Sequence, residues 1–254
     1  MQELRTDPRT HLETCAPESA DRQPGQRSDL VQRVIKRQPK RVSSHYEGQQ
    51  GSAYHDWQAA IGEVGASLNL FKFAPQIQPG DTVVDFGCGT GGLLSNIVCA
   101  RRLAVEVNTD SARVAASRGI EVVANAPELP AGIADVVITN HALEHTLDPL
   151  SELMSLYDAL RVGGRLLAVV PCERDSRAYA SGDINRHLFA WTPMTFGNLL
   201  DEAGYRVESS VILWHAWRTG YLKFAGKPWY GTLAWVTAHL LHRPQVQAVA
   251  VKDG

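Results

Sequence analysis

The sequence has few cysteines, and they lie far apart. Cys15, Cys88, Cys99 and Cys172 form no Cys-x-x-Cys pair, so neither a disulfide framework nor a zinc knuckle is predicted. No apolar run approaches the roughly 18 residues that a membrane span needs. The first thirty residues hold charges and prolines instead of a signal sequence. These absences predict a cytoplasmic protein with no membrane span.

The sequence also has no excess of one charge. Lys and Arg total 25 against 27 Asp and Glu, which gives a formal net charge of −2 over 254 residues. This balance disfavours nucleic-acid binding by bulk positive charge, so no nucleic-acid partner is expected.

The composition changes along the chain and predicts three segments. Residues 1–41 carry four prolines and few large apolar side chains, which predicts a flexible N-terminal arm. Residues 42–80 become aromatic and apolar at helical spacing. Residues 81–254 carry the main domain, with an apolar insert at about 214–242. This insert could form a pocket wall, a homodimer face or a shallow membrane contact.

Short β-branched runs alternate with helical stretches in the main domain. One helical stripe is Leu93, Leu94, Ile97 and Val98, and a second runs from 147 to 160 and is ended by Gly163 and Gly164. A third begins at the Thr192-Pro193 cap and stops at Gly204. Strands are predicted over 82–85, 103–107, 121–124, 136–139, 166–170, 205–213 and 246–251. This rhythm predicts an α/β fold with a mostly parallel sheet and helices on both faces.

A glycine-rich loop follows the first predicted strand. The segment Val83-Val84-Asp85-Phe86-Gly87-Cys88-Gly89-Thr90-Gly91-Gly92 turns a buried strand into a helix, where backbone can approach a ligand closely. Its glycines also satisfy G-x-G-x-x-G, the dinucleotide fingerprint. The glycines alone therefore leave an NAD-dependent oxidoreductase and a methyltransferase open.

Two acids near this loop separate the alternatives. Asp85 precedes the first glycine, where a carboxylate would repel a pyrophosphate and attract the ammonium of an amino acid. S-adenosylmethionine has that ammonium and no phosphate. Glu106 follows the second strand and is placed to accept two ribose hydroxyl hydrogen bonds, a role common to both cofactors. A catalytic Tyr-x-x-x-Lys pattern, expected for the oxidoreductase, is missing.

The chain resembles class I S-adenosylmethionine-dependent methyltransferases in five ordered segments, 83–92, 103–108, 125–130, 135–145 and 161–165. The resemblance implies a Rossmann-like fold with a seven-stranded sheet, S-adenosylmethionine as cofactor and S-adenosylhomocysteine as product. It also implies that residues 42–80 act as a lid over the cofactor cleft. Many relatives carry Asp where this chain has Asn125, although an amide oxygen can still bond the adenine amino group. The implied cofactor residues are Asp85, Gly87, Cys88 and Gly89 for methionine, Glu106 and Val107 for ribose, Asn125 and Ala126 for adenine, and Asn140 and His141 beside the sulfonium.

The acceptor is expected beyond the carboxyl ends of the fourth and fifth strands, where open α/β sheets bind ligands. A histidine there could remove the acceptor proton. We predict that His187 rather than His141 does so, because the former follows the fifth strand on the acceptor side. Packing roles for both histidines stay open. Predicted substrate-binding residues are Tyr54, Trp57, Asp183 and Trp191, of which the first two could equally be core residues.

Glu144 and His145 are adjacent metal-ligand types. Neighbours on a helix point about 100° apart, and the spacing fixes no third ligand, so we assign no metal. The predicted function is methyl transfer to a small molecule, most simply to an oxygen of a saccharide or secondary metabolite. The alternatives are N- or C-methyl transfer, an NAD-dependent oxidoreductase, and a non-catalytic scaffold.

Overall fold

A computed structural model describes residues 43, 46, 48–172, 179, 181, 183 and 185–254, without the side chains of residues 48–50, 53, 54, 57 and 59–61. The predicted arm, residues 1–41, lies outside the described residues, as do the side chains of Tyr54 and Trp57. The chain from Arg41 to Gly254 forms one compact unit.

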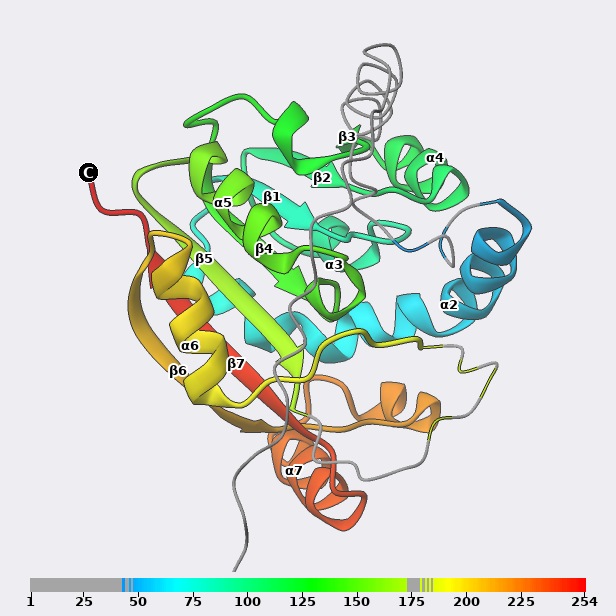
Figure 1. The fold of residues 1–254 in the computed structure, drawn as a ribbon. Coiled ribbons are helices and arrows are strands. Elements are labelled where there is room, and N and C mark those ends of the chain that lie inside the picture. Colours follow the sequence, from blue (N-terminus) through cyan, green and yellow to red (C-terminus); the bar gives the residue numbers. More distant parts are fainter. Residues whose placement is uncertain are drawn as a thin grey trace, which may run out of the picture. The chain divides into compact units, whose positions relative to one another are not determined.

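A seven-stranded sheet organises this unit (Figure 1), with the order β3-β2-β1-β4-β5-β7-β6. Strands β1 to β5 are parallel, and β7 lies antiparallel between β5 and β6. This confirms the predicted seven-stranded, mostly parallel sheet. The strands are β1 Thr82–Phe86, β2 Arg101–Val105, β3 Glu121–Val123, β4 Ala134–Asn140, β5 Leu160–Pro171, β6 Arg206–Trp214 and β7 Pro244–Val251.

Helices cover both faces of the sheet, as predicted. Neighbouring residues of β1 show why: Val83 packs in one apolar core with Leu94 and Ala115, and Val84 packs in the other with Leu156 and Phe196. Side chains alternate along a strand, so two adjacent apolar residues such as Val83 and Val84 need cover on both sides of the sheet. The α-helices are α2 Gly48–Asn69, α3 Gly92–Ser95, α4 Thr109–Ser117, α5 Pro149–Ala159, α6 Pro193–Glu202 and α7 Tyr230–Leu240.

Short 3-10 helices connect several of these elements. They are η2 Leu70–Lys72, η3 Ala74–Gln76, η4 Ala126–Glu128, η5 Leu143–His145 and η6 Thr219–Phe224. Within the predicted insert, η6 and α7 pack back onto α2 through a small core that contains Leu68, Tyr230 and Ala234. In the described part of the chain, every helix is too short or too polar to cross a bilayer.

Two predicted helix boundaries are wrong. Helix α3 ends at Ser95, and Val98 is 71% exposed instead of completing an apolar stripe. Helix α5 ends at Ala159 because Leu160 already pairs with Ala134 of β4, and β5 then continues through a register shift. Gly163, with φ of 77°, therefore lies in the strand and does not end the helix. Strand pairing across the sheet overrides the local helical pattern.

The start of α6 agrees with the sequence. The Thr192 side chain accepts from the backbone of Thr195, whose hydroxyl in turn accepts from the Thr192 backbone, forming a reciprocal capping box before Pro193. Gly204, with φ of 95°, follows the helix. Local side-chain chemistry thus fixes this helix start.

Candidate active site

The glycine loop lies between β1 and α3 and needs glycine for steric reasons. Gly87 has φ of 74°, and a Cβ there would lie 2.4 Å from the Cβ of Ala142. A side chain would push apart the segments that follow β1 and β4. The loop therefore holds two strand ends close together and leaves exposed backbone above them.

Glu106 is fixed by backbone donors from two segments. Its Oε2 accepts from the Gly89 N–H over 2.8 Å, and its Oε1 accepts from the Asn108 N–H over 2.8 Å. Burial raises the pKa of this carboxyl group, and these donors partly offset that effect. The carboxylate is therefore oriented before any ligand arrives.

Asp85, at the end of β1, is 2% exposed. Burial and, to a lesser degree, the charge of Glu106 raise the pKa of Asp85 to about 7. A cationic ligand group beside this carboxyl would favour its ionised form.

A small cavity of about 90 Å³ lies beside Glu106. Of the predicted cofactor residues, it is lined by Gly87, Glu106, Val107, Asn125 and His141. Ala126 lies in the apolar core and is 1% exposed.

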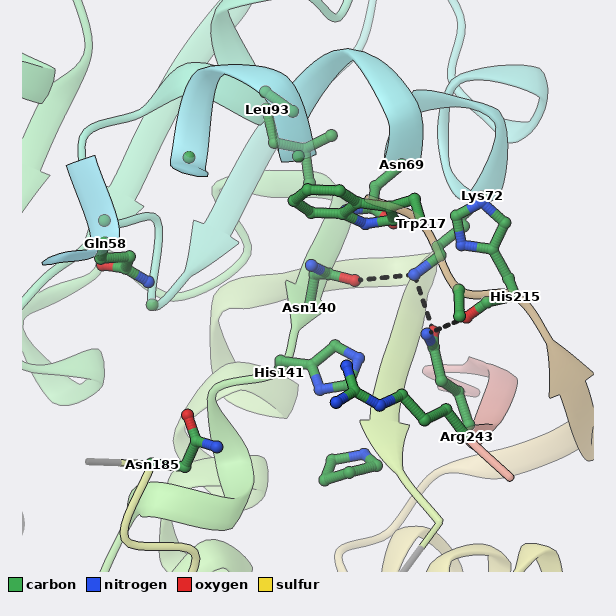
Figure 2. Close-up of a pocket in the computed structure, with 18 of the residues that line it drawn as sticks. Gln58, Asn69, Lys72, Leu93, Asn140, His141, Asn185, His215, Trp217 and Arg243 are labelled. Atoms are coloured by element: carbon green, nitrogen blue, oxygen red, sulfur yellow. Dashed lines mark hydrogen bonds between the residues drawn. The ribbon is translucent and has the colours of Figure 1, made fainter. Parts of the chain in front are cut away.

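A larger cavity of about 1320 Å³ extends from the glycine loop to the beginning of β7 (Figure 2). Ligand pockets typically measure about 300–1,000 Å³, so this one has room for a cofactor and an acceptor. Its lining includes the predicted residues Asp85, Gly87, Cys88, Gly89, Asn140, His141 and His187.

Two predicted substrate residues lie away from both cavities. Trp191 is 5% exposed and packs edge-on against Phe196 in the core. Asp183 is exposed and accepts hydrogen bonds from the backbone of Asn185 and Arg186. In the structure the former packs the core and the latter shapes its own loop.

His141 lies where the two cavities meet, because it lines both. Its backbone has φ of 57°, which is uncommon for a residue other than glycine. Its backbone N–H donates to the carbonyl oxygen of Val169 over 2.8 Å. Its Nδ1 lies 3.3 Å from Oε1 of Glu144. Strain of this kind often marks functional positions.

Lys72 is a cavity residue that sequence reasoning missed. It is 2% exposed, and burial lowers its pKa to about 7. Its Nζ donates to Gln245 Oε1 over 2.7 Å and to Asn140 Oδ1 over 3.4 Å (Figure 2). The available signal was a single lysine inside the apolar run Leu70-Phe71-Lys72-Phe73.

Residues 59–210 match a protein family described as a methyltransferase domain. This match covers more than half of the chain. The chain belongs to this methyltransferase family. Methyltransferases of this family use S-adenosylmethionine, which confirms the predicted family, reaction type and cofactor. A search of curated protein sequences finds no match.

Solved methyltransferase structures share the fold at low sequence identity. A Haloferax volcanii methyltransferase, solved with a methyltransferase activator, has a TM-score of 0.61 and 16% identity over 80% of this chain and 96% of that chain. Phosphoethanolamine N-methyltransferase 2 of Haemonchus contortus has a TM-score of 0.60 and 14% identity over 83% of this chain and 59% of that chain. Geranyl diphosphate C-methyltransferase of Streptomyces coelicolor has a TM-score of 0.54 and 16% identity over 81% of this chain and 85% of that chain.

The described site fits this methyltransferase's cofactor chemically. Glu106 presents a fixed carboxylate of the kind that accepts ribose hydroxyls, and Asp85 presents a buried acid for an ammonium group. A Cβ at Gly89 would lie 3.2 Å from Gln58 Oε1, and the residue has φ of 54°, so a side chain would be strained there. When bound, S-adenosylmethionine would supply an electrophilic methyl group.

Proposed function

We propose that this methyltransferase transfers the methyl group to an oxygen atom of a small acceptor that carries an anionic group, such as an acidic or phosphorylated saccharide or secondary metabolite. The lining of the large cavity carries the proposal. Lys72, Arg218 and Arg243 bring three cationic side chains to it, against Asp85 and Glu144 as the acidic lining residues among those described. A phosphate or carboxylate would supply these cations with a counter-ion.

Lys72 gives the strongest reason for an anion. Its ammonium group is buried and contacts two amide oxygens rather than a carboxylate. Burial without an opposite charge disfavours the ammonium, as its pKa of about 7 reflects. A bound anion would restore the charged form, and the energy gained would favour anionic over neutral ligands.

The two arginines extend the cationic surface toward solvent. Arg218 and Arg243 are exposed, and the Arg243 side chain reaches across the cavity toward His141 (Figure 2). A guanidinium group binds phosphate or carboxylate in a fixed, two-pronged geometry. The acceptors named for two structures of the same fold, phosphoethanolamine and geranyl diphosphate, also carry phosphate.

His141 is the base that we propose for the reaction. It would take the hydroxyl proton as the acceptor oxygen bonds to the methyl carbon and the carbon–sulfur bond breaks. The products are the methylated acceptor, S-adenosylhomocysteine and a protonated histidine. Glu144, 3.3 Å from its Nδ1, would stabilise the imidazolium. The sequence-based choice, His187, is the alternative base; it lines only the large cavity.

The experiment measures S-adenosylhomocysteine release from paired acceptors that differ only in an anionic group, for example glucose 1-phosphate against methyl glucoside. We expect turnover in the anionic members of such pairs. Arg243→Gln should raise KM for these acceptors about tenfold or more, since a charge-assisted bond contributes about 1.5–3 kcal/mol. Affinity for S-adenosylhomocysteine should stay unchanged.

Lys223→Gln is the matched control, because Lys223 is an exposed cation of η6 that does not line the large cavity. Equal turnover of neutral and anionic acceptors would contradict the anionic class. Calorimetric binding of NAD but not of S-adenosylhomocysteine would favour the oxidoreductase alternative, and cofactor binding without any turnover would favour a scaffold.

A further inference from the structure

Glu144, at the centre of η5, is a fully buried carboxylate with an incomplete environment. It is 0% exposed, and neither of its oxygens accepts a hydrogen bond from the residues that the structure describes. An ionised carboxylate without donors costs several kcal/mol when it is removed from water. A cation at this position would offset that cost.

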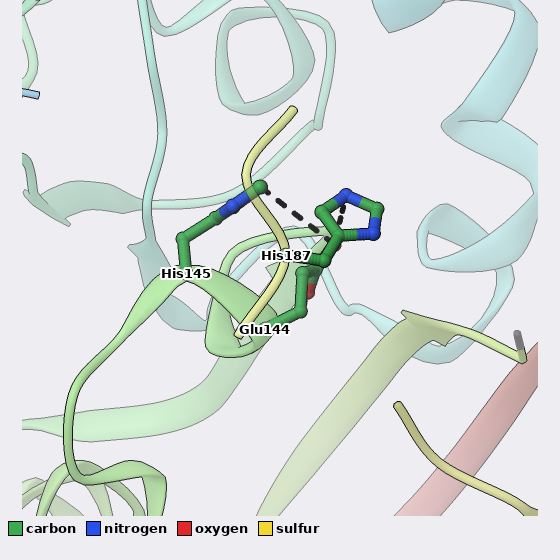
Figure 3. Close-up of side chains that lie close together, drawn as sticks. All are labelled: Glu144, His145 and His187. Carbon is green, nitrogen blue, oxygen red and sulfur yellow. Dashed lines mark ion pairs between the residues drawn. The ribbon is translucent and has the colours of Figure 1, made fainter. Parts of the chain in front are cut away.

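Three imidazole nitrogens surround the carboxylate. Oε1 of Glu144 lies 3.3 Å from His141 Nδ1, 3.9 Å from His145 Nε2 and 4.0 Å from His187 Nε2. All three distances exceed those of N–H···O hydrogen bonds, which are about 2.7–3.2 Å. Two ligands bound at about 2.0–2.2 Å to one tetrahedral ion lie roughly 3.3–3.6 Å apart. Small side-chain shifts would therefore place these atoms on a common ion (Figure 3).

His145 is held through its other ring nitrogen. Its Nδ1 lies 2.6 Å from the hydroxyl oxygen of Tyr46, which also donates to the carbonyl oxygen of Asn185 over 3.0 Å. The nitrogen nearer to Glu144 is Nε2, 3.9 Å from Oε1. A hydrogen bond to the second ring nitrogen is typical of histidines that bind a metal ion.

His187 is held in place from a distant part of the chain. The backbone N–H of the next residue, Leu188, donates to the carbonyl oxygen of Glu144 over 2.8 Å. The rings of His145 and His187 meet edge to face with centroids 4.9 Å apart. The segment before α6 is thereby fixed against η5, and the three candidate ligand atoms lie within 4.8 Å of one another.

We propose that Glu144, His145 and His187 bind one divalent transition-metal ion. Two imidazoles and one carboxylate suit zinc or ferrous iron rather than magnesium or calcium, which prefer oxygen ligands. All three residues line the large cavity. The ion therefore keeps a coordination position open to an oxygen atom in that cavity. Ion binding does not depend on which acceptor the enzyme uses.

The sequence alone assigns no metal here, because spacing fixes no third ligand beside Glu144 and His145. In the structure these two residues lie on a 3-10 turn, and the proposed third ligand comes from the loop after β5. The fold supplies a ligand that local spacing cannot.

The test uses the full-length, untagged protein after treatment with a chelator and dialysis. Zinc chloride is titrated in a calorimeter, and cobalt(II) chloride is followed by its visible absorption. We expect one ion per chain and cobalt bands typical of nitrogen and oxygen ligands. His187→Ala and Glu144→Gln should each weaken binding by at least about tenfold, because even the loss of a ligand's hydrogen-bond partner commonly costs about 10- to 100-fold.

His242→Asn is the control, since His242 is an exposed histidine of the same cavity outside the cluster, and asparagine tolerates its φ of 48°. Circular dichroism and S-adenosylhomocysteine affinity report folding. If Glu144→Gln misfolds, His187→Ala and His187→Gln decide. Substoichiometric zinc binding by the wild type, or equal binding by wild type and folded His187 variants, would overturn the proposal.

Discussion

The backbone N–H of Gly89 donates to the Glu106 carboxylate over 2.8 Å, which joins the loop after β1 to the end of β2. The bond orients the Glu106 carboxylate toward the glycine loop, and we predict that both contact the cofactor. The two sequence motifs therefore act as one structural unit, and a change in either should affect the same ligand.

Glu106→Ala should weaken cofactor binding without unfolding the protein. The proposed ribose contacts are charge-assisted hydrogen bonds, each contributing about 1.5–3 kcal/mol, so affinity should fall roughly tenfold or more. Calorimetric titration with S-adenosylhomocysteine measures the change. Glu121→Gln, an exposed acid paired with Arg101 on neighbouring strands, should bind normally. Unchanged affinity for Glu106→Ala would remove the ribose assignment.

Asp85 should make cofactor affinity depend on pH. Burial raises the pKa of Asp85 to about 7, so the carboxylate and its attraction for an ammonium are lost as pH falls below that value. An α-amino group loses its proton at about pH 7.7–8.0. Affinity for S-adenosylhomocysteine should therefore peak between about pH 7 and 8.

Asp85→Asn provides the control for this profile. The asparagine amide has no titrating proton. The variant's affinity for S-adenosylhomocysteine should therefore be lower than that of the wild type at the optimum, and it should not fall further between about pH 7.5 and 6. Calorimetry across this range measures both proteins. An acidic decline that persists in the variant would assign the titration to another group.

His141→Ala and His187→Ala should separate the two candidate bases. If His141 takes the proton, its loss should lower kcat about 10²- to 10⁴-fold, and His187→Ala should retain more activity under the same metal-free conditions. Single-turnover kinetics with saturating cofactor isolates this step from cofactor binding. The reverse order would restore His187 as the base, and small losses in both would indicate a reaction driven by proximity alone.

Gly87→Ala should destabilise the protein more than Gly119→Ala. Both glycines have similar backbone angles, with φ of 74° and 79°, but a Cβ at Gly87 meets Ala142 at 2.4 Å whereas one at Gly119 meets nothing within 4 Å. Strain at positive φ costs about 1–3 kcal/mol in each, so the difference in melting temperature reports the close approach. Equal decreases in melting temperature for the two variants would mean that the loop accommodates a Cβ at position 87 without additional loss of stability.

The sequence by itself determined the fold class and indicated the cofactor. The strand, the glycine loop and the helix are local features, because each depends on residues within one turn or one strand. The cap at Thr192 is of the same kind. Where pairing across the sheet competed with a local pattern, as at Leu160, the sequence prediction failed.

Only the tertiary structure decided what lies beyond the cofactor. Lys72 meets Gln245 of β7, and Glu144 meets His187, through contacts between segments far apart in the chain. Local periodicity carries no information about such pairs. Their chemistry arises because η2, the ends of β4 and β5, and the start of β7 converge at one edge of the sheet, where parallel strands end together and leave a cavity.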